Sequence, residues 1–443
     1  MRGTVIQFIL MLMLVLFNSP MVTARTEITD YETLTLRLYN EQKWDSLLLI
    51  GEEAISKGYD YYYMRVRVGE AAFYKQRFVR AARHLEKALE FNTTDEYANR
   101  LLYKSYLYSS RTEDARWLLR KLSPEFAGSF GKAEKKPLVY LETGPAFSNH
   151  VKQFEENRQP GRGTYSEAYL NRNSQYLLTG AYFPVGYRSG VNAAFGVLNF
   201  TKNRRVDITF IDSLSGDYSV FQMEAYISPS FNLTRRIKIS PAFRLVNVSL
   251  ENPLTSDDSL VQMIVGPAKA LSYNDYAYGG ELSYSAPLWT LSGGVWSLKV
   301  DKLEFIQATA SLFCKPLGNL NLYSLTTASL KSSQNNNEYI FYQMIGGKIY
   351  HKLWGEASVS RGDLSGTAEQ NLQLIYNSID KVKTRIGARL IVSVNDYLSL
   401  SLRYQIFFVQ GTELFFPVDE PGQIYSYKYI NQSITGGIKW KLH

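Results

Sequence analysis

The sequence predicts an all-α helical repeat domain followed by an all-β antiparallel transmembrane barrel of about 14 strands. Helical patterning with a 34-residue period covers about one hundred residues near the N-terminus, and strict polar–apolar alternation covers the rest. Aromatic residues make up 14% of the chain, with 33 Tyr and 23 Phe. Such a composition is typical of sheets that carry aromatic girdles at membrane interfaces.

Length and composition exclude several classes of protein. A chain of 443 residues is long enough for two or three domains, and 45% hydrophobic with 20% charged residues excludes a disordered chain. The single cysteine, Cys314, excludes a disulfide framework, a multi-cysteine zinc site and an iron–sulfur cluster held by this chain alone. The net charge of +8 is a mild, dispersed excess, so we expect no nucleic-acid partner.

Residues 1–24 are predicted to be a secretory signal peptide. Arg2 precedes an apolar stretch from Val5 to Phe17, and Val22-Thr23-Ala24 has the small-x-small form that a signal peptidase cleaves. The apolar stretch is shorter than the roughly 20 residues that a spanning helix needs, although an uncleaved anchor is the alternative. No cysteine lies near Ala24, which excludes N-terminal lipidation there.

Residues 25–130 are predicted to contain helical repeats. Small and apolar residues recur at fixed positions of a 34-residue period, where two helices would pack closely. In the unit that starts at Tyr62 they are Gly69, Phe78, Ala81, Leu85 and Ala88. The next unit has Tyr106, Ala115 and Leu119, and the preceding unit has Trp44 and Ala54. This pattern resembles the tetratricopeptide repeat, although Arg65 and Thr93 occupy positions where Trp and Pro are usual. A plain helical bundle is the alternative.

The resemblance implies a partner for this domain. Stacked repeats form a curved solenoid whose concave face binds an extended peptide or a helix of another protein. From their repeat positions, we expect Tyr61, Arg65, Asn99 and Tyr103 to contact a periplasmic protein or peptide. The alternative for each of them is ordinary solvated helix surface.

Residues 131–443 are predicted to form an outer-membrane barrel, joined to the helices by a linker over residues 125–137. In Thr384 to Val394, for example, every second residue is apolar, and Arg385, Arg389 and Ser393 stand between them. Segments of 10 to 15 such residues exceed ordinary strands, and about 9 to 11 tilted residues cross a bilayer. A soluble sandwich would have shorter strands and many edges, so the pattern favours the barrel.

The charged residues of these segments fall on the polar phase and are expected to face the lumen, because facing lipid would cost about 2–4 kcal/mol each at the midplane. Residues 131–443 hold 31 Lys and Arg against 25 Asp and Glu. A basic lumen would favour an anionic solute or a polysaccharide. Alternatively, these cations pair with inward carboxylates such as Glu281 or Glu356. The candidate residues of the basic lumen are Arg236, Lys238, Arg244, Arg385, Arg389 and Arg403.

Short interruptions of the polar–apolar alternation predict where strands turn. Between Leu288 and Gly318 the alternation cannot be followed from one strand to the next, so strand boundaries there are not predicted. We expect short turns on the periplasmic side and longer loops outside. The short breaks lie at 184–189, 231–235, 315–320, 350–354 and 394–398. The longer polar segments lie at 148–173, 251–272 and 410–423.

The C-terminal segment resembles the terminal signal that the barrel assembly machinery reads in outer-membrane proteins. Thr435, Gly437, Trp440 and Leu442 fill the polar, glycine and hydrophobic positions of that signal. The sequence departs from it by one trailing residue, His443.

The sequence predicts neither an enzyme nor a metal or cofactor site. The four histidines, His84, His150, His351 and His443, stand at no metal-ligand spacing, and no Gly-x-Ser-x-Gly motif or glycine-rich phosphate loop occurs. An outer-membrane hydrolase stays open as a lesser alternative, with His150 or His351 as its base.

The order of parts is similar to that of outer-membrane proteins that couple periplasmic repeats to a pore, as in exopolysaccharide exporters and YaiO-like barrels. The resemblance implies a component of transport, secretion or envelope assembly, with outer-membrane lipid around the barrel. A scaffold whose barrel only anchors a binding module is the alternative.

Overall fold

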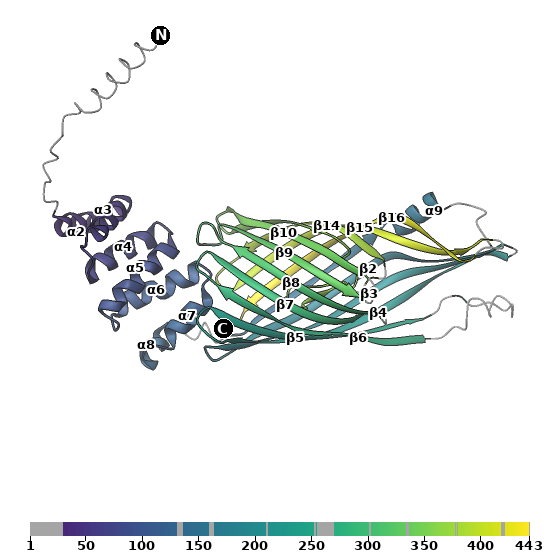
Figure 1. Cartoon of the computed structure of the whole chain (residues 1–443), viewed down its shortest axis with the longest axis horizontal. Helices are drawn as coiled ribbons and strands as arrows, with labels where there is room; N and C mark the ends of the chain where they lie inside the picture. Colours follow the sequence, from purple (N-terminus) through teal and green to yellow (C-terminus); the bar gives the residue numbers. More distant parts are fainter. Residues whose placement is uncertain are drawn as a thin grey trace, which may run out of the picture.

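The computed structural model describes residues 30–130, 136–158, 164–209, 211–251, 254, 270–300, 303–333, 336–376, 378, 380–417 and 421–442. The predicted signal peptide lies outside these residues. The helices of residues 31–129 form one domain and the strands another, and these helices lie at one end of the barrel (Figure 1). Within these ranges, no helix is both long enough and apolar enough to cross a bilayer.

In the described part of the chain, seven helices precede the barrel. Three of them begin at side-chain caps, since Asp30, Asp95 and Ser123 each accept a hydrogen bond from a backbone N–H of the first helical turn. The helices are α2 (Tyr31–Asn40), α3 (Trp44–Ser56), α4 (Tyr62–Tyr74), α5 (Phe78–Phe91), α6 (Glu96–Tyr108), α7 (Thr112–Leu119) and α8 (Pro124–Ser129).

The turn geometry of this domain repeats every 34 residues. Gln42, Gln76 and Ser110 adopt left-handed φ angles of 54°, 57° and 54° in the turns α2–α3, α4–α5 and α6–α7. Small residues lie where the helices pack: Ala81 and Ala88 are fully buried, and a Cβ at Gly69 would come within 2.9 Å of Leu85 Cγ. Most of the small and apolar positions predicted from the period thus lie in the core of the helical domain, whereas Trp44 and Phe78 are half-buried.

We expect Ala81→Trp to destabilise this domain by about 1–3 kcal/mol, because the buried site has no room for a larger side chain. Urea unfolding of the full chain, followed by the helical circular-dichroism signal, measures this change. Arg83→Trp is the matched control, since Arg83 lies on the same helix and is exposed. Equal unfolding midpoints for the two variants would contradict the packing at Ala81.

The strands form a closed antiparallel barrel of 14 strands, which confirms the predicted number. Its order is β1-β16-β15-β14-β11-β10-β9-β8-β7-β6-β5-β4-β3-β2. The strands are β1 (Leu138–Ser148), β2 (Tyr165–Val185), β3 (Ser189–Ile208), β4 (Ile211–Asn232), β5 (Ile237–Glu251), β6 (Ala270–Ser285), β7 (Trp289–Val300), β8 (Leu303–Cys314), β9 (Leu322–Ser333), β10 (Asn336–Tyr350), β11 (Leu353–Arg361), β14 (Lys381–Ser393), β15 (Leu398–Phe416) and β16 (Gln423–Lys441).

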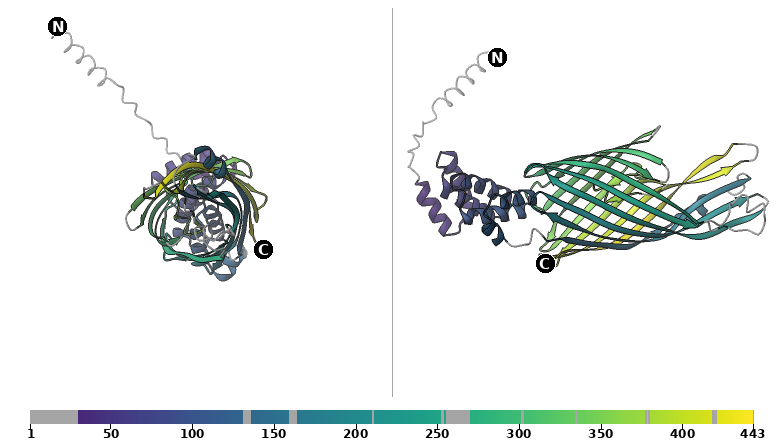
Figure 2. Two further views of the ribbon diagram at one scale, coloured as in Figure 1. Left: turned by 90° about the vertical axis from the view of Figure 1, so that its right-hand side faces the viewer. Right: turned by 90° about the horizontal axis from the view of Figure 1, so that it is seen from below.

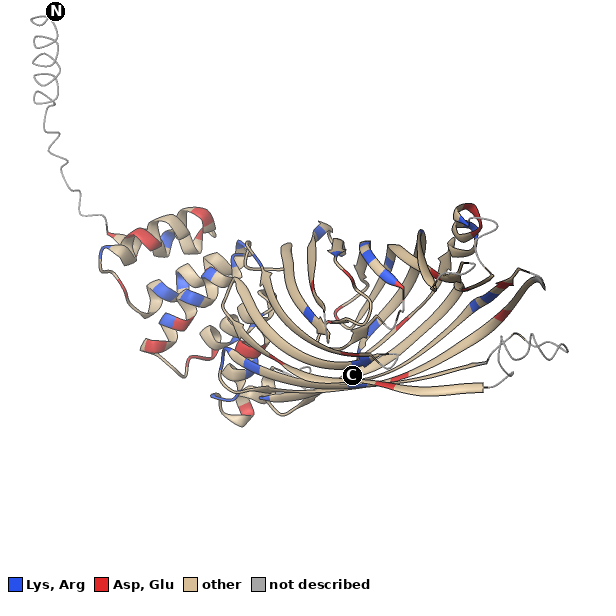
Figure 3. Ribbon diagram, turned by 45° about the vertical axis from the view of Figure 1, so that its right-hand side comes forward, with Lys and Arg blue, Asp and Glu red and all other residues tan. Residues whose placement is uncertain are grey.

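The outer face of the barrel is apolar, as the alternation predicts. Ile386, Leu390 and Val392 of β14 are exposed, whereas Arg385, next to Ile386, is buried. Acidic and basic residues are mixed over the helices, whereas long stretches of strand carry neither (Figure 3). An apolar outer face around a closed sheet is the surface that a lipid bilayer requires.

Two belts of exposed aromatic side chains mark the limits of this apolar band. The first lies beside the short turns at the end of the barrel next to the helices, which we call the helix end. It contains Phe183, Phe231, Tyr284, Trp289, Tyr350, Tyr397 and Trp440. The second contains Phe221, Tyr276, Phe341 and Phe408, which lie 8 to 11 residues farther along the strands. At about 3.3 Å per residue and a tilt of about 40°, this spacing corresponds to the roughly 25 Å of a membrane barrel's apolar band.

All five predicted short breaks are turns at the helix end, but a sixth turn was missed. Residues 286–288 connect β6 to β7 there, and β7 then turns tightly into β8, with Val300 paired to Leu303. This hairpin lies where the alternation fails. Gly293 and Gly294 are adjacent in β7 and have no side chains, so the sequence does not show which of them faces the lumen and which faces outward.

Two of the predicted long loops are wrong in extent. β2 begins at Tyr165 and β15 continues to Phe416, so much of 148–173 and 410–423 is strand. These strand ends pair with each other, Leu414 with Glu167 and Phe416 with Tyr165. Their polar residues therefore belong to a wall that continues past the second aromatic belt, at the far end of the barrel (Figures 1 and 2).

Candidate functional site

The lumen contains a segment that the sequence did not reveal. Between β11 and β14 the chain folds back into the barrel as residues 362–376, which we call the lumen loop; it includes the short strands β12 (Ala368–Glu369) and β13 (Leu374–Ile375). The Gln307 side chain donates to Ala368 O at 2.8 Å and accepts from Ala368 N at 2.9 Å. Lys331 Nζ donates to Ser365 O at 2.7 Å. The loop is thus bound to the inner wall.

The tip of the lumen loop is held on the opposite wall. Gln370, Asn371 and Leu372 all adopt left-handed φ angles, 51°, 57° and 66°, which cost roughly 1 kcal/mol or more each for residues other than glycine. Tyr226 of β4 donates to Asn371 O at 3.0 Å, and Arg244 of β5 donates to Leu372 O at 3.1 Å. These contacts fix a strained tip across the bore.

The six candidate residues of the basic lumen divide into three groups. Arg244 and Arg385 bind the lumen loop, since Arg244 donates to its carbonyls and Arg385 Nη2 lies 3.0 Å from Glu369 Oε2. Nearer the helix end, both Arg389 and Arg403 lie near Glu142 Oε1, at 3.6 and 3.3 Å.

The remaining two residues lie close to the helix end. Arg236 donates to Tyr284 OH at 3.0 Å, and Lys238 is paired in the sheet with Ser283. Of the two carboxylates named as possible partners, Glu356 lies 3.9 Å from Arg389. Glu281 makes no ion pair within the described part of the chain. The arrangement places carboxylates or carbonyls beside most of the lumen's cations.

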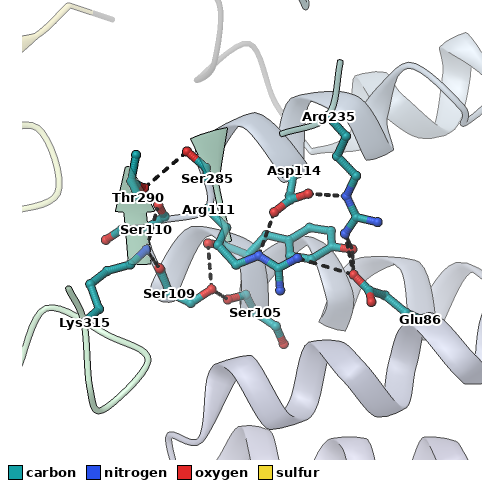
Figure 4. Close-up of polar contacts among 11 residues, drawn as sticks. Glu86, Ser105, Ser109, Ser110, Arg111, Asp114, Arg235, Ser285, Thr290 and Lys315 are labelled. Atoms are coloured by element: carbon teal, nitrogen blue, oxygen red, sulfur yellow. Dashed lines mark hydrogen bonds and ion pairs between the residues drawn. The ribbon is translucent and has the colours of Figure 1, made fainter. Parts of the chain in front are cut away.

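A cluster of charges joins the helical domain to the barrel (Figure 4). Arg235, in the β4–β5 turn, contacts Glu86 of α5 and Asp114 of α7, and donates to Tyr106 OH at 2.6 Å. Arg111 donates to Asp114 at 2.6 Å from the other side. Burial raises the pKa of Glu86, but the hydrogen bond from Tyr106 and the charges of Arg235 and Arg111 outweigh it and leave that pKa below its ordinary value. Glu86 therefore stays ionised in the contact.

Two further turns take part in this contact. Lys315, after β8, donates to Ser109 O at 2.8 Å. In the β2–β3 hairpin, Tyr182 accepts from Arg116 at 3.1 Å, and the guanidinium of Arg188 lies 4.7 Å from the ring centre of Trp117. The helical domain thus rests on three turns of the barrel, and in the end-on view it falls within the outline of the ring (Figure 2).

We expect docking of the helical domain to strengthen as the pH rises from about 8 toward 10.5. Burial, and secondarily the charge of Arg111, lowers the pKa of Lys315 from 10.5 to about 8. The docked state therefore disfavours the ammonium form of Lys315, and this weakens docking by its full amount below pH 8, where Lys315 is protonated in both states. The free-energy cost falls to zero as the pH approaches 10.5, where Lys315 of the undocked state also loses its proton. Spin labels at the exposed residues Leu49 and Val394, in a Cys314→Ser background, report docking as a narrow distance distribution.

Lys315→Met should remove this pH dependence. Lys352→Met, at an exposed lysine of the β10–β11 turn, should preserve it. Unchanged pH dependence in Lys315→Met would exclude Lys315 as its source.

The helical domain carries a groove of about 610 Å³ beside this contact. Its floor is apolar, with Leu102, Trp117 and Phe126, and Arg235 closes its barrel end.

Of the four residues expected to bind a partner, only Asn99 lines the groove, and its amide donates to Asp95 O at 2.7 Å. Tyr103 is buried against Phe130, and Tyr61 packs against the helical core. Arg65 is paired with Asp60 at 2.6 Å. The structure does not bring these four side chains together on one open face.

The two histidines considered as catalytic bases have other neighbours. His150 begins α9 (His150–Asn157) at the far end, stacks on Tyr429 at 3.6 Å, and uses its two ring nitrogens for Asn171 N–H and Tyr427 OH. Burial lowers the pKa of His150 to about 3, so it stays neutral. His351 lies in the β10–β11 turn against Tyr350. Across the described ranges, no three His, Cys, Asp or Glu side chains gather as a metal site would require.

The residues of the predicted C-terminal signal lie on or just after the last strand. Thr435 is paired with Arg403 of β15, Gly437 lies between Glu142 of β1 and Ser401 of β15, and Trp440 faces outward in the first aromatic belt. Leu442 follows the strand, and its N–H donates to Pro137 O at 2.9 Å.

Comparisons with known proteins give a similarity in fold. No family model and no curated protein matches the sequence. Among solved structures, the chain is similar to the toluene transporter TodX of Pseudomonas putida, at 10% identity and a TM-score of 0.39 over 72% of this chain and 92% of that one. A FadL homologue of Pseudomonas aeruginosa is 11% identical, with a TM-score of 0.40 over 72% of this chain and 94% of that one. A bacterial polysaccharide outer membrane secretin is 10% identical, with a TM-score of 0.33 over 69% of this chain and 98% of that one. At TM-scores below 0.5, nothing about cargo or mechanism follows for this chain.

Proposed function

We propose that this protein is an outer-membrane barrel in transport or secretion, whose periplasmic helical domain docks a protein partner or cargo at the mouth of the lumen. The contact of Arg235 with Glu86 and Asp114 carries this proposal, because it holds the helical groove beside the barrel's opening. The recurrence of the turn geometry every 34 residues supports tetratricopeptide repeats. The two aromatic belts support a place in a membrane.

In this proposal the lumen loop is the element that closes the conduit. It crosses the bore from its attachment between β11 and β14 to Arg244 of β5 on the other side of the ring. A cargo would pass only when contacts such as Arg385 with Glu369 open. The filled lumen also favours a second candidate function, a scaffold whose barrel anchors the helical domain and never conducts.

Conductance of the full chain in a planar bilayer separates the two candidates. For a conduit, we expect rare openings in the wild type and at least tenfold more frequent openings in Arg385→Ala, which loses the contact with Glu369. Arg403→Ala is the matched control, since Arg403 is paired with Glu142 and, among the described residues, makes no hydrogen bond or ion pair with the lumen loop. Silence of both the wild type and Arg385→Ala would overturn the conduit and leave the scaffold.

A further inference from the structure

A cavity of about 160 Å³ lies in the lumen between the lumen loop and the inner wall of β6–β10. Hydroxyl groups line this wall on three neighbouring strands: Ser292 on β7, Thr309 and Ser311 on β8, and Thr327 and Ser329 on β9. Ser311 and Thr327 hydrogen-bond each other at 2.9 Å. Ser292 and Ser329 have no hydrogen-bond partner for their hydroxyls among the described residues. The wall therefore offers free donors and acceptors to a solute.

An indole ring lies flat against the same wall. Trp296 of β7 lines the cavity, and its ring covers Gly279 of β6 and Gly294 of β7. A Cβ at Gly279 would come within 2.7 Å of the Trp296 ring, and one at Gly294 within 2.8 Å. The two glycines thus make room for the ring to lie along the sheet, where it is 2% exposed, packs in one apolar cluster with Leu372 and Ile375 of the lumen loop, and borders the cavity.

Further acceptors reach the cavity from two sides. Glu281 of β6 lines it and makes no hydrogen bond or ion pair within the described part of the chain. Asn371, at the strained tip of the lumen loop, donates to Ser228 at 2.9 Å, but its Oδ1 is buried without a partner. Buried polar atoms without partners are uncommon, so Asn371 Oδ1 points to a ligand that donates hydrogen bonds.

The charges around the cavity select against an anion. No Lys or Arg lines it, while the carboxylates Glu281 and Glu369 do, and only Glu369 is paired, with Arg385. An anionic solute would meet the charge of Glu281, which has no ion-pair partner among the described residues. An uncharged molecule with many hydroxyls meets the hydroxyl wall and the carboxylate without such a cost.

We propose that this cavity binds a small, uncharged, polyhydroxylated solute of the size of one sugar ring, bordered by Trp296 and hydrogen-bonded to the hydroxyl wall and Glu281. The inference rests on the proposed function, because it names the class of solute that the conduit would hold. It also assigns a role to the loop tip, since Asn371 would contact the same solute from the opposite side.

Binding of D-glucose to the full chain in detergent, measured by saturation-transfer NMR, tests this site. We expect saturable binding that Ser292→Ala/Ser329→Ala weakens at least fivefold, and that Trp296→Leu weakens at least tenfold. The two serine hydroxyls hold nothing in the protein, so their removal leaves the barrel folded even if Trp296→Leu disturbs it. Trp289→Leu is the matched control, because Trp289 lies on the same strand and faces outward.

D-Glucuronate provides the charge test. It should bind at least tenfold more weakly than glucose, and Glu281→Gln should reduce that preference. Absence of glucose binding, or equal binding by wild type and the double serine variant, would overturn the site. Conductance separates the two failures: a barrel that opens without binding glucose disproves only this inference, whereas a barrel that binds glucose and stays silent disproves only the conduit.

Discussion

Replacing Trp440 and Leu442 by Asp should abolish assembly of the barrel while leaving export intact. Both residues fill hydrophobic positions of the C-terminal signal, and Trp440 also faces the membrane interface in the first aromatic belt. Its strand closes the ring by pairing with β1 on one side and β15 on the other, with Trp440 opposite Val139 and Leu398. A charged residue there leaves the seam without its apolar contact with lipid.

Cell fractionation and heat-dependent gel migration measure this loss, because closed barrels resist detergent until they are boiled. We expect at least a tenfold reduction of the membrane-embedded, heat-modifiable form. Removal of His443 alone is the control and should leave it unchanged, since that residue trails the signal. Normal amounts of the embedded form in the double Asp variant would show that β16 carries no assembly information.

Reversing the charge of Arg235 should detach the helical domain from the barrel. In Arg235→Glu a third carboxylate would face Glu86 and Asp114, and Tyr106 would lose its donor. Removing one partner of such a cluster costs about 2–5 kcal/mol; since Arg235 and Glu86 are each about one-third exposed (35% and 33%), we take the lower figure. About 2 kcal/mol corresponds to a roughly thirtyfold shift of the docking equilibrium.

The spin-label pair at Leu49 and Val394 reads this shift as a broadened distance distribution. Adding Glu86→Arg to Arg235→Glu should restore part of the narrow component, because the reversed pair attracts again. Arg236→Glu is the control at the neighbouring residue, whose side chain contacts Tyr284 of β6 and no helix. If Arg235→Glu kept the wild-type distribution, the cluster would not hold the two domains together.

The period of two predicted the barrel well because lipid imposes one rule on every strand. Arg385 and Arg389 fall inward and Ile386 and Leu390 outward, as their phase requires. The same rule placed five turns, since a turn interrupts the alternation.

The contacts that form the site could not be predicted in this way. The Arg235 and Glu86 contact joins residues that are 149 positions apart, and His150 and Tyr427 are 277 apart. No local pattern encodes such pairings. The lumen loop left one trace in the sequence, namely that the alternation stops at Arg361 and resumes only at Lys381. A segment of that length without alternation is equally consistent with an external loop, so the sequence does not predict that these residues fold back into the lumen.

The first aromatic belt also sets how far the helical groove lies from the lipid. Phe231 belongs to that belt, and Arg235 is four residues away in the same turn, bound to the helices. The groove that Arg235 closes is therefore held within a few residues' length of the headgroup layer. A binding partner must reach the docked domain at the bilayer surface itself. Molecules tethered to the same membrane have a higher effective concentration in the solvent layer next to the bilayer than freely diffusing ones. They would therefore meet the groove far more often.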